Sequence, residues 1–460
     1  MKKKIAIFGG SFNPPRRVHR LILEMLSHEH DFDEVIVVPC GPRPDKPVTN
    51  DIDTVHRAAM ADIAFGGLPK VRVELFDLEN GTFTRTHKLE EMFGNEGEIW
   101  HVVGADLVKG GGQGRSFIQR EWEKGEQIWQ ELNFVVARRQ GAAISDQDLP
   151  PKNQTSLASF HGSSSEVRNK VFNRESIHGL VDPRVEDYID RYGLYRRSAS
   201  TLLRVRIDWP KAQPRLVFDA LNPKAVALVK SLKVVESNEP NVILVVGGDG
   251  FMLHTIRKHW RERLPFFGIN AGTHGFLMNE VTSPAVSALS AGYLNVEADH
   301  MPLLYVQIKN ADGTEKSTLA FNDVWIERTT GQTAWIEVEI DGVKRIARLM
   351  ADGILAATPA GSTAYAKAMG ALAVPTHAPI LTLVGSNVMF PHWKATQIPL
   401  ESTVTWRTLD LQKRPLKCFV DGLDQGLAAE VTIRKSRIAA VELVTPPDRA
   451  EKIIASQFPG

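Results

Sequence analysis

Short apolar runs that end in glycine, alternating with helix-length segments, most constrain how this chain folds. The run KIAIF (4–8) is followed by Gly9 and Gly10, and apolar residues then recur at helical spacing over 18–26. Further buried-strand candidates are residues 34–40, 71–76, 99–106 and 134–139, with helical segments such as 54–65, 116–131 and 181–197 around them. Because strands that alternate with helices form right-handed βαβ units, the pattern predicts a parallel sheet with helices on both faces.

The pattern starts again near residues 198–200, which predicts a second part of the chain. NVILVVGGDG (241–250) and PFFGIN (265–270) each join an apolar strand to a turn. After about residue 293, β-branched and partly alternating segments dominate, and Asp341-Gly342 is a typical hairpin turn. The sequence therefore predicts an α/β protein with a Rossmann-like first domain, an α/β lobe and a mostly β lobe.

The charge and cysteine content exclude several classes of protein. The 460 residues hold 55 Lys and Arg against 54 Asp and Glu, a net charge of +1, so no global charge favours nucleic acid or membranes as partners. No uncharged apolar run reaches about 18 residues, and the apolar stretch after MKKK is too short for a signal peptide. The two cysteines, Cys40 and Cys418, form no CxxC, which argues against disulfides and zinc and favours the cytoplasm.

The first glycine turn has the properties of a phosphate site. Bare backbone after a strand lets a phosphate approach, and the next helix turns its positive N-terminal end toward it. A tight turn alone would also explain two glycines, but further motifs follow in order: GGSFNPP (9–15), His19, GPRPDK (41–46), TFTRT (82–86), VVGAD (102–106), Trp122 and GSSSEVR (162–168). In this order the set resembles the nicotinate or nicotinamide mononucleotide adenylyltransferase family, over essentially all of residues 1–197.

This resemblance implies a nucleotidyltransferase domain that joins ATP to a pyridine mononucleotide with Mg²⁺, mostly by positioning and charge stabilisation. It implies that His19 contacts the ATP phosphates as the catalytic residue. Thr84 and Trp122 would hold the pyridine mononucleotide, and Gly104 and Asp106 the adenosine ribose. The full set of ATP- or mononucleotide-binding residues that it implies is Gly9, Gly10, Ser11, Phe12, Arg16, Lys46, Thr84, Gly104, Asp106, Trp122, Ser163, Ser164 and Arg168.

Two positions depart from the pattern of that family. The family has His-x-Gly-His where this chain has Arg16-Arg17-Val18-His19. In one interpretation, Arg16 donates to the triphosphate in place of an imidazole, with a longer side chain and differently placed donors. In the other, the site is damaged, since loss of one such donor commonly lowers the rate by about 10²–10³ and Val18 adds a Cβ near the phosphates.

The second glycine turn carries a carboxylate. Gly247-Gly248-Asp249-Gly250 follows a fully apolar strand, and such a carboxylate can accept a proton from a hydroxyl or hold Mg²⁺. Further segments follow: FFGINAGTHGFL (266–277), Asn322-Asp323, ADGILAATPAGSTAYAKAMG (351–370) and Asp421-Gly422. Together these segments resemble NAD kinase over roughly residues 200–450.

The kinase resemblance implies ATP-dependent phosphorylation of the 2′-hydroxyl of NAD, with Asp249 as general base. It implies an α/β lobe over 200–295 and a β-rich lobe over 296–460 whose C-terminal segment returns to the α/β lobe. The NAD-binding residues that it implies are Gly250, Asn322, Asp323, Asp352, Thr363, Ala364, Tyr365 and Asp421. Asn322-Asp323 stands where the family has Asn-Glu, Phe251 where threonine is common, and Ala366 and Ala368 where serines are usual.

The sequence thus predicts a bifunctional enzyme that makes a pyridine dinucleotide and then phosphorylates it, with ATP and NAD as substrates and Mg²⁺ as divalent cation. No HExxH motif or histidine cluster predicts a metal site on the protein itself. We expect small-molecule nucleotides as partners and, by the kinase resemblance, a homo-oligomer. Two alternatives stay open: an NAD kinase with a degenerate adenylyltransferase domain in a structural role, and a non-catalytic NAD sensor. Fusion of the two activities favours the amide mononucleotide, because the acid product would need amidation before the kinase step.

Overall fold

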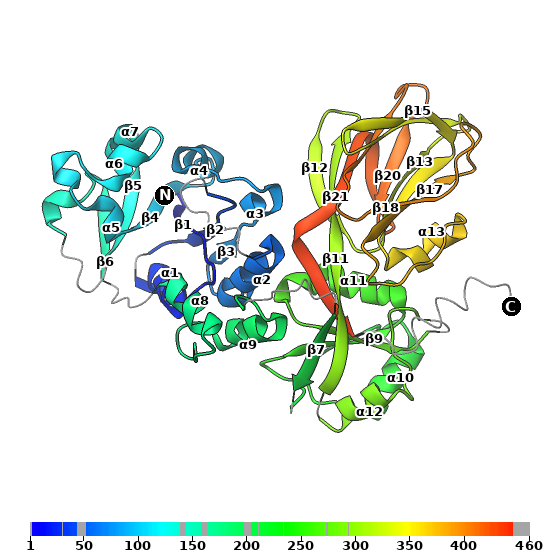
Figure 1. Cartoon of the computed structure of the whole chain (residues 1–460), viewed down its shortest axis with the longest axis horizontal. Coiled ribbons are helices and arrows are strands. Elements are labelled where there is room, and N and C mark those ends of the chain that lie inside the picture. The colour runs from blue at the N-terminus through cyan, green and yellow to red at the C-terminus, as the bar shows by residue number, and fades with distance from the viewer. Residues whose placement is uncertain are drawn as a thin grey trace. The chain divides into compact units, whose positions relative to one another are not determined.

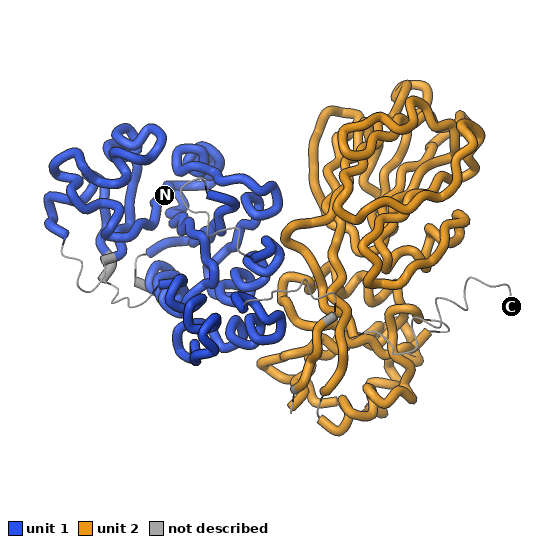
Figure 2. The backbone as a smooth tube through the Cα atoms, in the orientation of Figure 1, with its two compact units in different colours: residues 1–200 blue, residues 201–460 orange. Residues whose placement is uncertain are grey.

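The computed structural model of the chain describes residues 2–29, 31–43, 52–138, 144–157, 163–196, 204–209, 211–232, 234–272, 275–292 and 294–444. The chain divides into two compact units, residues 1–200 and 201–460, called unit 1 and unit 2 below (Figure 2).

Unit 1 is built on a six-stranded parallel sheet in the order β3-β2-β1-β4-β5-β6. The strands are β1 (Lys4–Gly10), β2 (Glu34–Pro39), β3 (Val71–Val73), β4 (Glu98–Gly104), β5 (Asn133–Arg138) and β6 (Asn153–Leu157). The strand order reverses between β1 and β4, and in such sheets ligands bind outside the carboxyl ends of the strands at this switch point. The fold therefore places Gly9, Gly10 and Gly104 at the expected position of a ligand.

Helices flank this sheet (Figure 1). They are α1 (Arg17–Glu29), α2 (Thr54–Phe65), α3 (Phe76–Asn80), α4 (Thr86–Phe93), α5 (Ala105–Val108), α6 (Phe117–Glu121), α7 (Gly125–Glu131), α8 (Ser164–Phe172) and α9 (Pro183–Tyr192), with 3-10 turns η2 (Gly111–Gln113) and η3 (Asp146–Asp148). The last of them, α9, is capped by Asp182, begins at a proline, which suits a first helical turn, and ends at Gly193 in the left-handed region.

Three local predictions for unit 1 need correction. The strand expected over 71–76 ends at Val73, and the chain enters α3 at Phe76. The helix expected over 116–131 is two helices, because Lys124 adopts a left-handed conformation between α6 and α7. The edge strand β6 was not predicted, since its sequence NQTSL has little apolar character.

Unit 2 begins with an α/β part. Strands β8 (Pro214–Phe218), β9 (Val242–Gly247) and β10 (Phe266–Asn270) pair in parallel, and β10 also pairs in parallel with the end of the last strand, at Phe266 and Leu443. Its helices are α10 (Pro223–Leu232), α11 (Asp249–His259) and α12 (Pro284–Ser290), with the 3-10 turn η4 (Trp260–Glu262). The end of this strand, near Leu443, thus returns to the sheet in which the glycine-rich turn lies.

The rest of unit 2 is mostly antiparallel. Its strands are β11 (Leu294–Asn310), β12 (Glu315–Ala320), β13 (Asp323–Arg328), β14 (Ala334–Ile340), β15 (Val343–Ala351), β16 (Gly353–Ala357), β17 (Ile380–Ser386), β18 (Thr396–Pro399), β19 (Val404–Thr408), β20 (Leu416–Val420) and β21 (Leu423–Val444); β7 (Arg204–Trp209) pairs with β11, and η5 (Gly361–Thr363) precedes α13 (Tyr365–Ala368). The long strands β11 and β21 pair antiparallel (Figure 1). The Asp341-Gly342 turn joins β14 to β15, which confirms the predicted hairpin.

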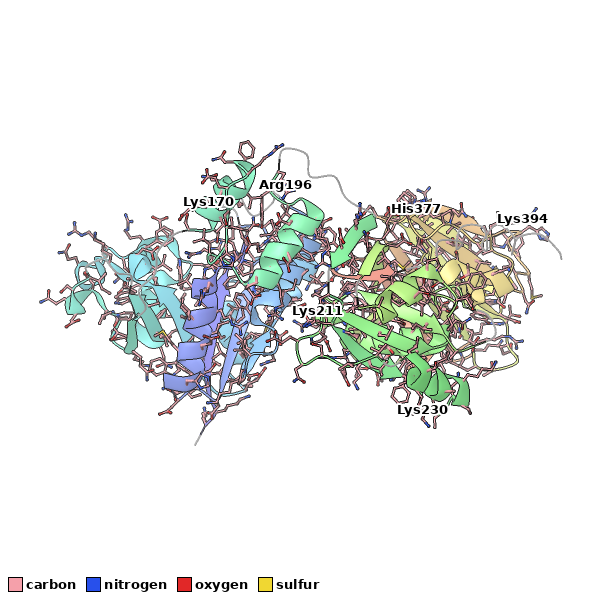
Figure 3. The ribbon with its side chains drawn as sticks, turned by 90° about the horizontal axis from the view of Figure 1, so that it is seen from below. Lys170, Arg196, Lys211, Lys230, His377 and Lys394 are labelled. Atoms are coloured by element: carbon pink, nitrogen blue, oxygen red, sulfur yellow. The ribbon has the colours of Figure 1, made fainter. Side chains whose placement is uncertain are left out.

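These two units confirm the predicted α/β class, with a Rossmann-like parallel sheet first and a large β lobe later. Charged side chains such as Lys230 and Lys394 extend from the surface of unit 2 (Figure 3). Among the described residues, none of the helices combines the length and apolar character needed to cross a membrane.

Candidate functional site

Two cavities in unit 1 meet at the first glycine turn. One, the glycine–histidine cavity, measures about 410 Å³ and is lined by Phe8, Gly9, Gly10, Ser11, Phe12, Asn13, His19, Ser164, Ser165 and Arg168. The other, the Phe83–Trp122 cavity, measures about 290 Å³ and also includes Gly9 and Gly10 in its wall. A Cβ on Gly9 would meet no atom within 4 Å, so the bare backbone leaves room in front of it. The two cavities therefore share one stretch of open main chain.

The glycine–histidine cavity gathers six of the predicted phosphate-site residues and His19. Its far wall is the start of α8, where Ser163 caps the helix by accepting the N–H of Glu166. Ser164 donates a hydrogen bond to the Pro14 carbonyl at 3.0 Å, and Arg168 donates to the Asn13 carbonyl at 2.7 Å. The helix thus holds the loop after β1, and its N-terminal dipole favours an anion in this cavity.

The environment of His19 defines its protonation. Its ring packs edge-on against Phe12, with centroids 5.1 Å apart, and its Nδ1 accepts the backbone N–H of Arg16 at 3.1 Å. Burial of the ring, and secondly the nearby Arg16 charge, lower the pKa of His19 to about 3. The imidazole is therefore neutral at physiological pH, and its proton resides on Nε2, which leaves one N–H donor for a ligand.

Arg57 connects the ends of the two central strands. Its guanidinium is fully buried and donates to the carbonyls of Ser11, at 2.7 Å, and Cys40, at 2.6 Å. These two residues directly follow β1 and β2, so Arg57 fixes the spacing of the loops around the glycine turn. Arg57 lies in the segment TVHRAAM (54–60), and nothing in the spacing of its residues indicates this bracing role.

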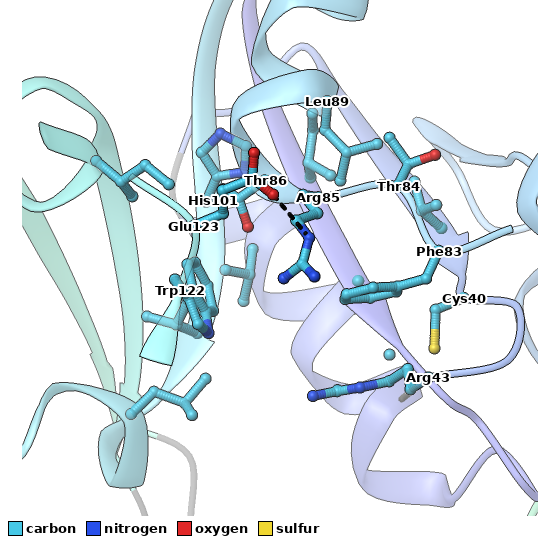
Figure 4. Close-up of a pocket in the computed structure, with 18 of the residues that line it drawn as sticks. Cys40, Arg43, Phe83, Thr84, Arg85, Thr86, Leu89, His101, Trp122 and Glu123 are labelled. Atoms are coloured by element: carbon cyan, nitrogen blue, oxygen red, sulfur yellow. Dashed lines mark ion pairs between the residues drawn. The ribbon is translucent and has the colours of Figure 1, made fainter. Parts of the chain in front are cut away.

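The Phe83–Trp122 cavity is shown in Figure 4. Thr84 and Trp122, both predicted to hold a pyridine mononucleotide, line it from opposite sides. Thr84 is fixed by Asp77, a buried carboxylate that accepts both the hydroxyl and the backbone N–H of Thr84. Charged residues that the sequence did not single out also line the wall, namely Arg43, Arg85, Glu121 and Glu123. They come from loops and helix ends without a periodic pattern, so sequence spacing carries no signal for them.

Four predicted residues of unit 1 remain, namely Gly104, Asp106, Arg16 and Lys46. Gly104 ends β4, and a Cβ there would come within 2.4 Å of Oδ1 of Asp106, so this position requires glycine for the carboxylate to fold back. Arg16 lies in the loop just before α1. Lys46 lies outside the described residues.

In unit 2, Asp249 ties the two glycine-rich turns together. It is the first residue of α11, directly after β9 and Gly248. Its Oδ2 accepts the N–H of Phe276 at 2.9 Å, and its Oδ1 accepts the N–H of Leu277 at 3.0 Å. Added Cβ atoms on Gly248 and Gly250 would meet nothing within 4 Å, so the backbone beside Asp249 is open.

Asp421 organises the predicted Asn322-Asp323 site. Its buried carboxylate accepts the backbone N–H groups of Phe321, Asn322 and Asp323 at 2.8, 2.7 and 3.1 Å. Arg257 of α11 donates to the Asp421 carbonyl at 3.3 Å, which links this segment to the helix that begins with Asp249. Asp421 is thus a structural cap under the site rather than an exposed ligand-binding group.

The Asn322-Asp323 pair itself is buried and incompletely satisfied. The side-chain oxygen of Asn322 is buried and accepts no hydrogen bond from the described residues. Burial, and secondly the charge of Asp421, raise the pKa of Asp323 to about 7. An unused buried acceptor next to an acid that titrates near neutrality is typical of a site that binds a ligand.

The TPAGSTAY segment packs against this pair. Thr358 donates its hydroxyl to the Phe321 carbonyl at 2.7 Å. A Cβ on Gly361 would lie 2.2 Å from the Asn322 carbonyl oxygen, so only glycine fits there. Beyond it, Thr363 and Ala364 lead into α13, whose Tyr365 contacts Trp325 edge-on at 5.2 Å. The fold therefore brings Asn322, Asp323, Thr363, Ala364, Tyr365 and Asp421 together.

Asp352, which was also predicted to bind NAD, lies apart from this group of residues. It precedes β16, whose antiparallel register with β13 pairs Gly353 with Glu327 and Ala357 with Asp323. Four residues of extended strand span roughly 13 Å, so Asp352 lies at the opposite end of these strands from Asp323. Its carboxylate accepts hydrogen bonds from Arg328 at 2.5 Å and Asn387 at 2.7 Å, which lower its pKa.

Comparisons with known proteins match both units. The Cytidylyltransferase-like family matches residues 7–170, and the ATP-NAD kinase N-terminal domain matches residues 214–296. An NAD kinase of Xanthomonas campestris pv. campestris (strain 8004) is 33% identical over 256 residues, which cover 54% of this chain and 98% of the relative. An NAD kinase of Rickettsia bellii (strain OSU 85-389) is 30% identical over 246 residues, or 52% of this chain and 95% of the relative.

Two solved structures are also similar. Yeast NADH kinase complexed with NADH has a TM-score of 0.46 and 18% identity, covering 53% of this chain and 87% of that chain. An NAD kinase from Archaeoglobus fulgidus in complex with ATP has a TM-score of 0.42 and 21% identity, covering 53% and 97%. The chain covers almost the whole length of the two sequence relatives, at 33% and 30% identity. Through its C-terminal part the chain belongs to the NAD kinase family, while residues 7–170 of its N-terminal part match the Cytidylyltransferase-like family model.

Proposed function

We propose that the chain is a bifunctional enzyme of pyridine-nucleotide biosynthesis. Unit 1 transfers the adenylyl group of ATP to nicotinamide or nicotinate mononucleotide, and unit 2 phosphorylates the 2′-hydroxyl of NAD to give NADP. The observation that carries the first activity is the shared glycine turn of the two cavities in unit 1. The observation that carries the second is Asp249 beside open glycine backbone, in a part of the chain that belongs to the NAD kinase family.

The proposed adenylyl transfer needs two phosphates side by side. An oxygen of the mononucleotide phosphate attacks the α-phosphorus of ATP, and pyrophosphate leaves with the electron pair of the broken P–O bond. A mononucleotide in the Phe83–Trp122 cavity and a triphosphate in the glycine–histidine cavity would meet at Gly9 and Gly10. Such an arrangement accelerates the reaction by positioning.

His19 acts in this proposal as a neutral donor. Because its Nδ1 is occupied by the Arg16 N–H, its Nε2–H is the group that can stabilise charge on a phosphate oxygen. Arg168 and the N-terminus of α8 supply further positive potential around the same cavity. No proton transfer by His19 is required, because the attacking phosphate is already ionised.

The proposed kinase step uses Asp249 as general base. The ribose 2′-hydroxyl attacks the γ-phosphorus of ATP, its proton passes to the Asp249 carboxylate, and ADP leaves. Both carboxylate oxygens accept backbone N–H groups, which aim them while leaving each oxygen a further lone pair. The side-chain oxygen of Asn322 has no hydrogen-bond partner among the described residues. In this proposal it accepts a hydrogen bond from NAD, such as one from the adenine amino group, close to Asp323.

The proposal also includes a metal ion, a cellular location and an oligomeric state. Among the described residues, no group of three or more His, Cys, Asp or Glu side chains could hold a metal ion. We therefore propose that Mg²⁺ arrives as the Mg·ATP substrate. Both cysteines are free and buried. Reduced cysteines and the use of ATP support our proposal that the enzyme is located in the cytoplasm. Self-association into a homo-oligomer stays a prediction.

One coupled assay tests the proposal. The full chain is given Mg·ATP and either mononucleotide, and the dinucleotide, NADP and pyrophosphate are resolved; NAD is supplied in a parallel reaction. Formation of the dinucleotide from mononucleotide, together with NADP from NAD, is the expected result. NADP from NAD without pyrophosphate release would favour the alternative that Arg16 and Val18 motivate, a kinase with a structural unit 1. Nucleotide binding without any product would instead favour a sensor.

A further inference from the structure

An ion pair crosses the wall of the Phe83–Trp122 cavity. Nε of Arg85 lies 3.0 Å from Oε2 of Glu123, and both residues line the cavity. Figure 4 shows the Arg85 guanidinium extending into the cavity beside Phe83, with Glu123 reaching it from the side of Trp122. The side chains are 44% and 54% exposed, so the pair is open to a ligand rather than sealed in the protein.

The two charges lie next to the residues assigned to the pyridine ring. Arg85 directly follows Thr84 and precedes α4, and Glu123 directly follows Trp122 in the break between α6 and α7. Because Nε of Arg85 is used by Glu123, its two terminal NH₂ groups remain as donors. Glu123 contributes carboxylate lone pairs as acceptors. The pair therefore offers donors and acceptors side by side, and its two opposite charges offset each other.

We propose that the Arg85–Glu123 pair makes unit 1 select nicotinamide mononucleotide over nicotinate mononucleotide. This inference rests on the proposed adenylyltransferase function. A carboxamide has a carbonyl that accepts from Arg85 and an NH₂ group that donates to Glu123, so it satisfies both partners. A carboxylate has acceptors alone, is repelled by Glu123, and must break the ion pair to use Arg85 fully.

The second guanidinium in the wall does not reverse this preference. Arg43 lies over the Phe83 ring, 5.2 Å from its centroid, and also attracts anions. In this proposal Arg43 attracts the phosphate, which both mononucleotides carry, so its contribution is the same for both. The difference between them is confined to the 3-substituent of the ring, where loss of complementary donors and acceptors commonly changes affinity at least tenfold.

The test measures the ratio of the two substrates on the full chain. Dissociation constants for both mononucleotides come from isothermal titration calorimetry, and kcat/KM with Mg·ATP from pyrophosphate release. We expect the native chain to prefer the amide at least tenfold in both measurements. Glu123→Gln keeps the size of the side chain but removes its charge, and frees Arg85 for a carboxylate; it should reduce the amide-to-acid ratio at least tenfold. A partly unfolded fraction cancels in this ratio, because both substrates are measured on one preparation.

Glu91→Gln is the matched control. Glu91 pairs with Lys88 on the surface of α4 at 2.7 Å, outside the cavity wall, and its substitution should leave the ratio unchanged. Equal or tighter binding of the acid by the native chain, or an unchanged ratio in Glu123→Gln, overturns the inference while adenylyl transfer still stands. An amide preference in binding without turnover supports the inference and overturns the proposed reaction. Failure to bind either mononucleotide overturns both.

Discussion

The backbone N–H of Arg16 donates a hydrogen bond of 3.1 Å to Nδ1 of His19. Arg16 occupies the position at which the adenylyltransferase pattern has its first histidine. Its backbone N–H fixes the tautomer of His19, the second histidine of that pattern. Burial of the ring, and secondly the Arg16 charge, lower the pKa of His19 to about 3. The single histidine is thereby kept as a neutral Nε2–H donor in the glycine–histidine cavity.

Replacement of His19 by alanine should reduce adenylyl transfer about 10²–10³-fold, because one preorganised donor to the phosphates is lost. Pyrophosphate release from Mg·ATP and mononucleotide measures the effect. NADP formation from NAD by the same preparation is the internal control and should not change. Adenylyl transfer at the native rate in His19→Ala would show that the imidazole contacts no reacting phosphate.

Restoration of the family pattern tests the two substitutions in the motif, Arg16 and Val18. Arg16→His combined with Val18→Gly should raise adenylyl transfer about tenfold or more, because it adds a second imidazole donor and removes a Cβ near the phosphates. The rate is compared with that of each single variant. An unchanged rate would mean that Arg16 already supplies the missing donor.

Asp249→Asn should reduce NADP formation by at least about 10²-fold, because an amide cannot accept the proton of the 2′-hydroxyl. The amide nitrogen would also face a backbone N–H of Phe276 or Leu277 in place of an acceptor, so the thermal midpoint of unit 2 is measured as well. A variant that keeps its fold and accumulates NADP at the native rate would refute the assignment of Asp249 as base.

The raised pKa of Asp323 predicts how the stability of unit 2 depends on pH. Its pKa is raised from 3.8 to about 7, first by burial and then by Asp421, so the folded state holds a proton that the unfolded chain releases. Its contribution to stability is complete below about pH 3.8 and is lost as pH rises through about 7, at roughly 1 kcal/mol per pH unit. Thermal unfolding between pH 4.5 and 8 should show this loss in the native chain.

The neutral isostere separates this effect from other titrations. In Asp323→Asn the pH dependence should be flatter over the same range, because the group no longer releases a proton. An identical slope in both proteins would assign the dependence to other groups.

Several elements followed from local sequence. The helix over 54–65 and the strands that end at Gly10, Pro39 and Gly247 were predicted within a residue or two, because apolar periodicity and glycine act over short distances. The strand predicted over 71–76 and the helix predicted over 116–131 were wrong in extent, since the strand ends at Val73 before α3 and a left-handed Lys124 divides the helix.

The order of the motifs along the chain was enough to identify the NAD kinase family of its C-terminal part. The resemblance of unit 1 to mononucleotide adenylyltransferases stays a prediction. Which groups meet was decided by the tertiary structure alone. Asp249 accepts N–H groups 27 and 28 residues further along, and Asp421 caps a segment about 100 residues earlier. The Arg85–Glu123 pair likewise joins two loops that carry no common pattern. A hydrogen bond or ion pair depends on positions within a few tenths of an ångström, and only the packed sheets bring such distant residues that close.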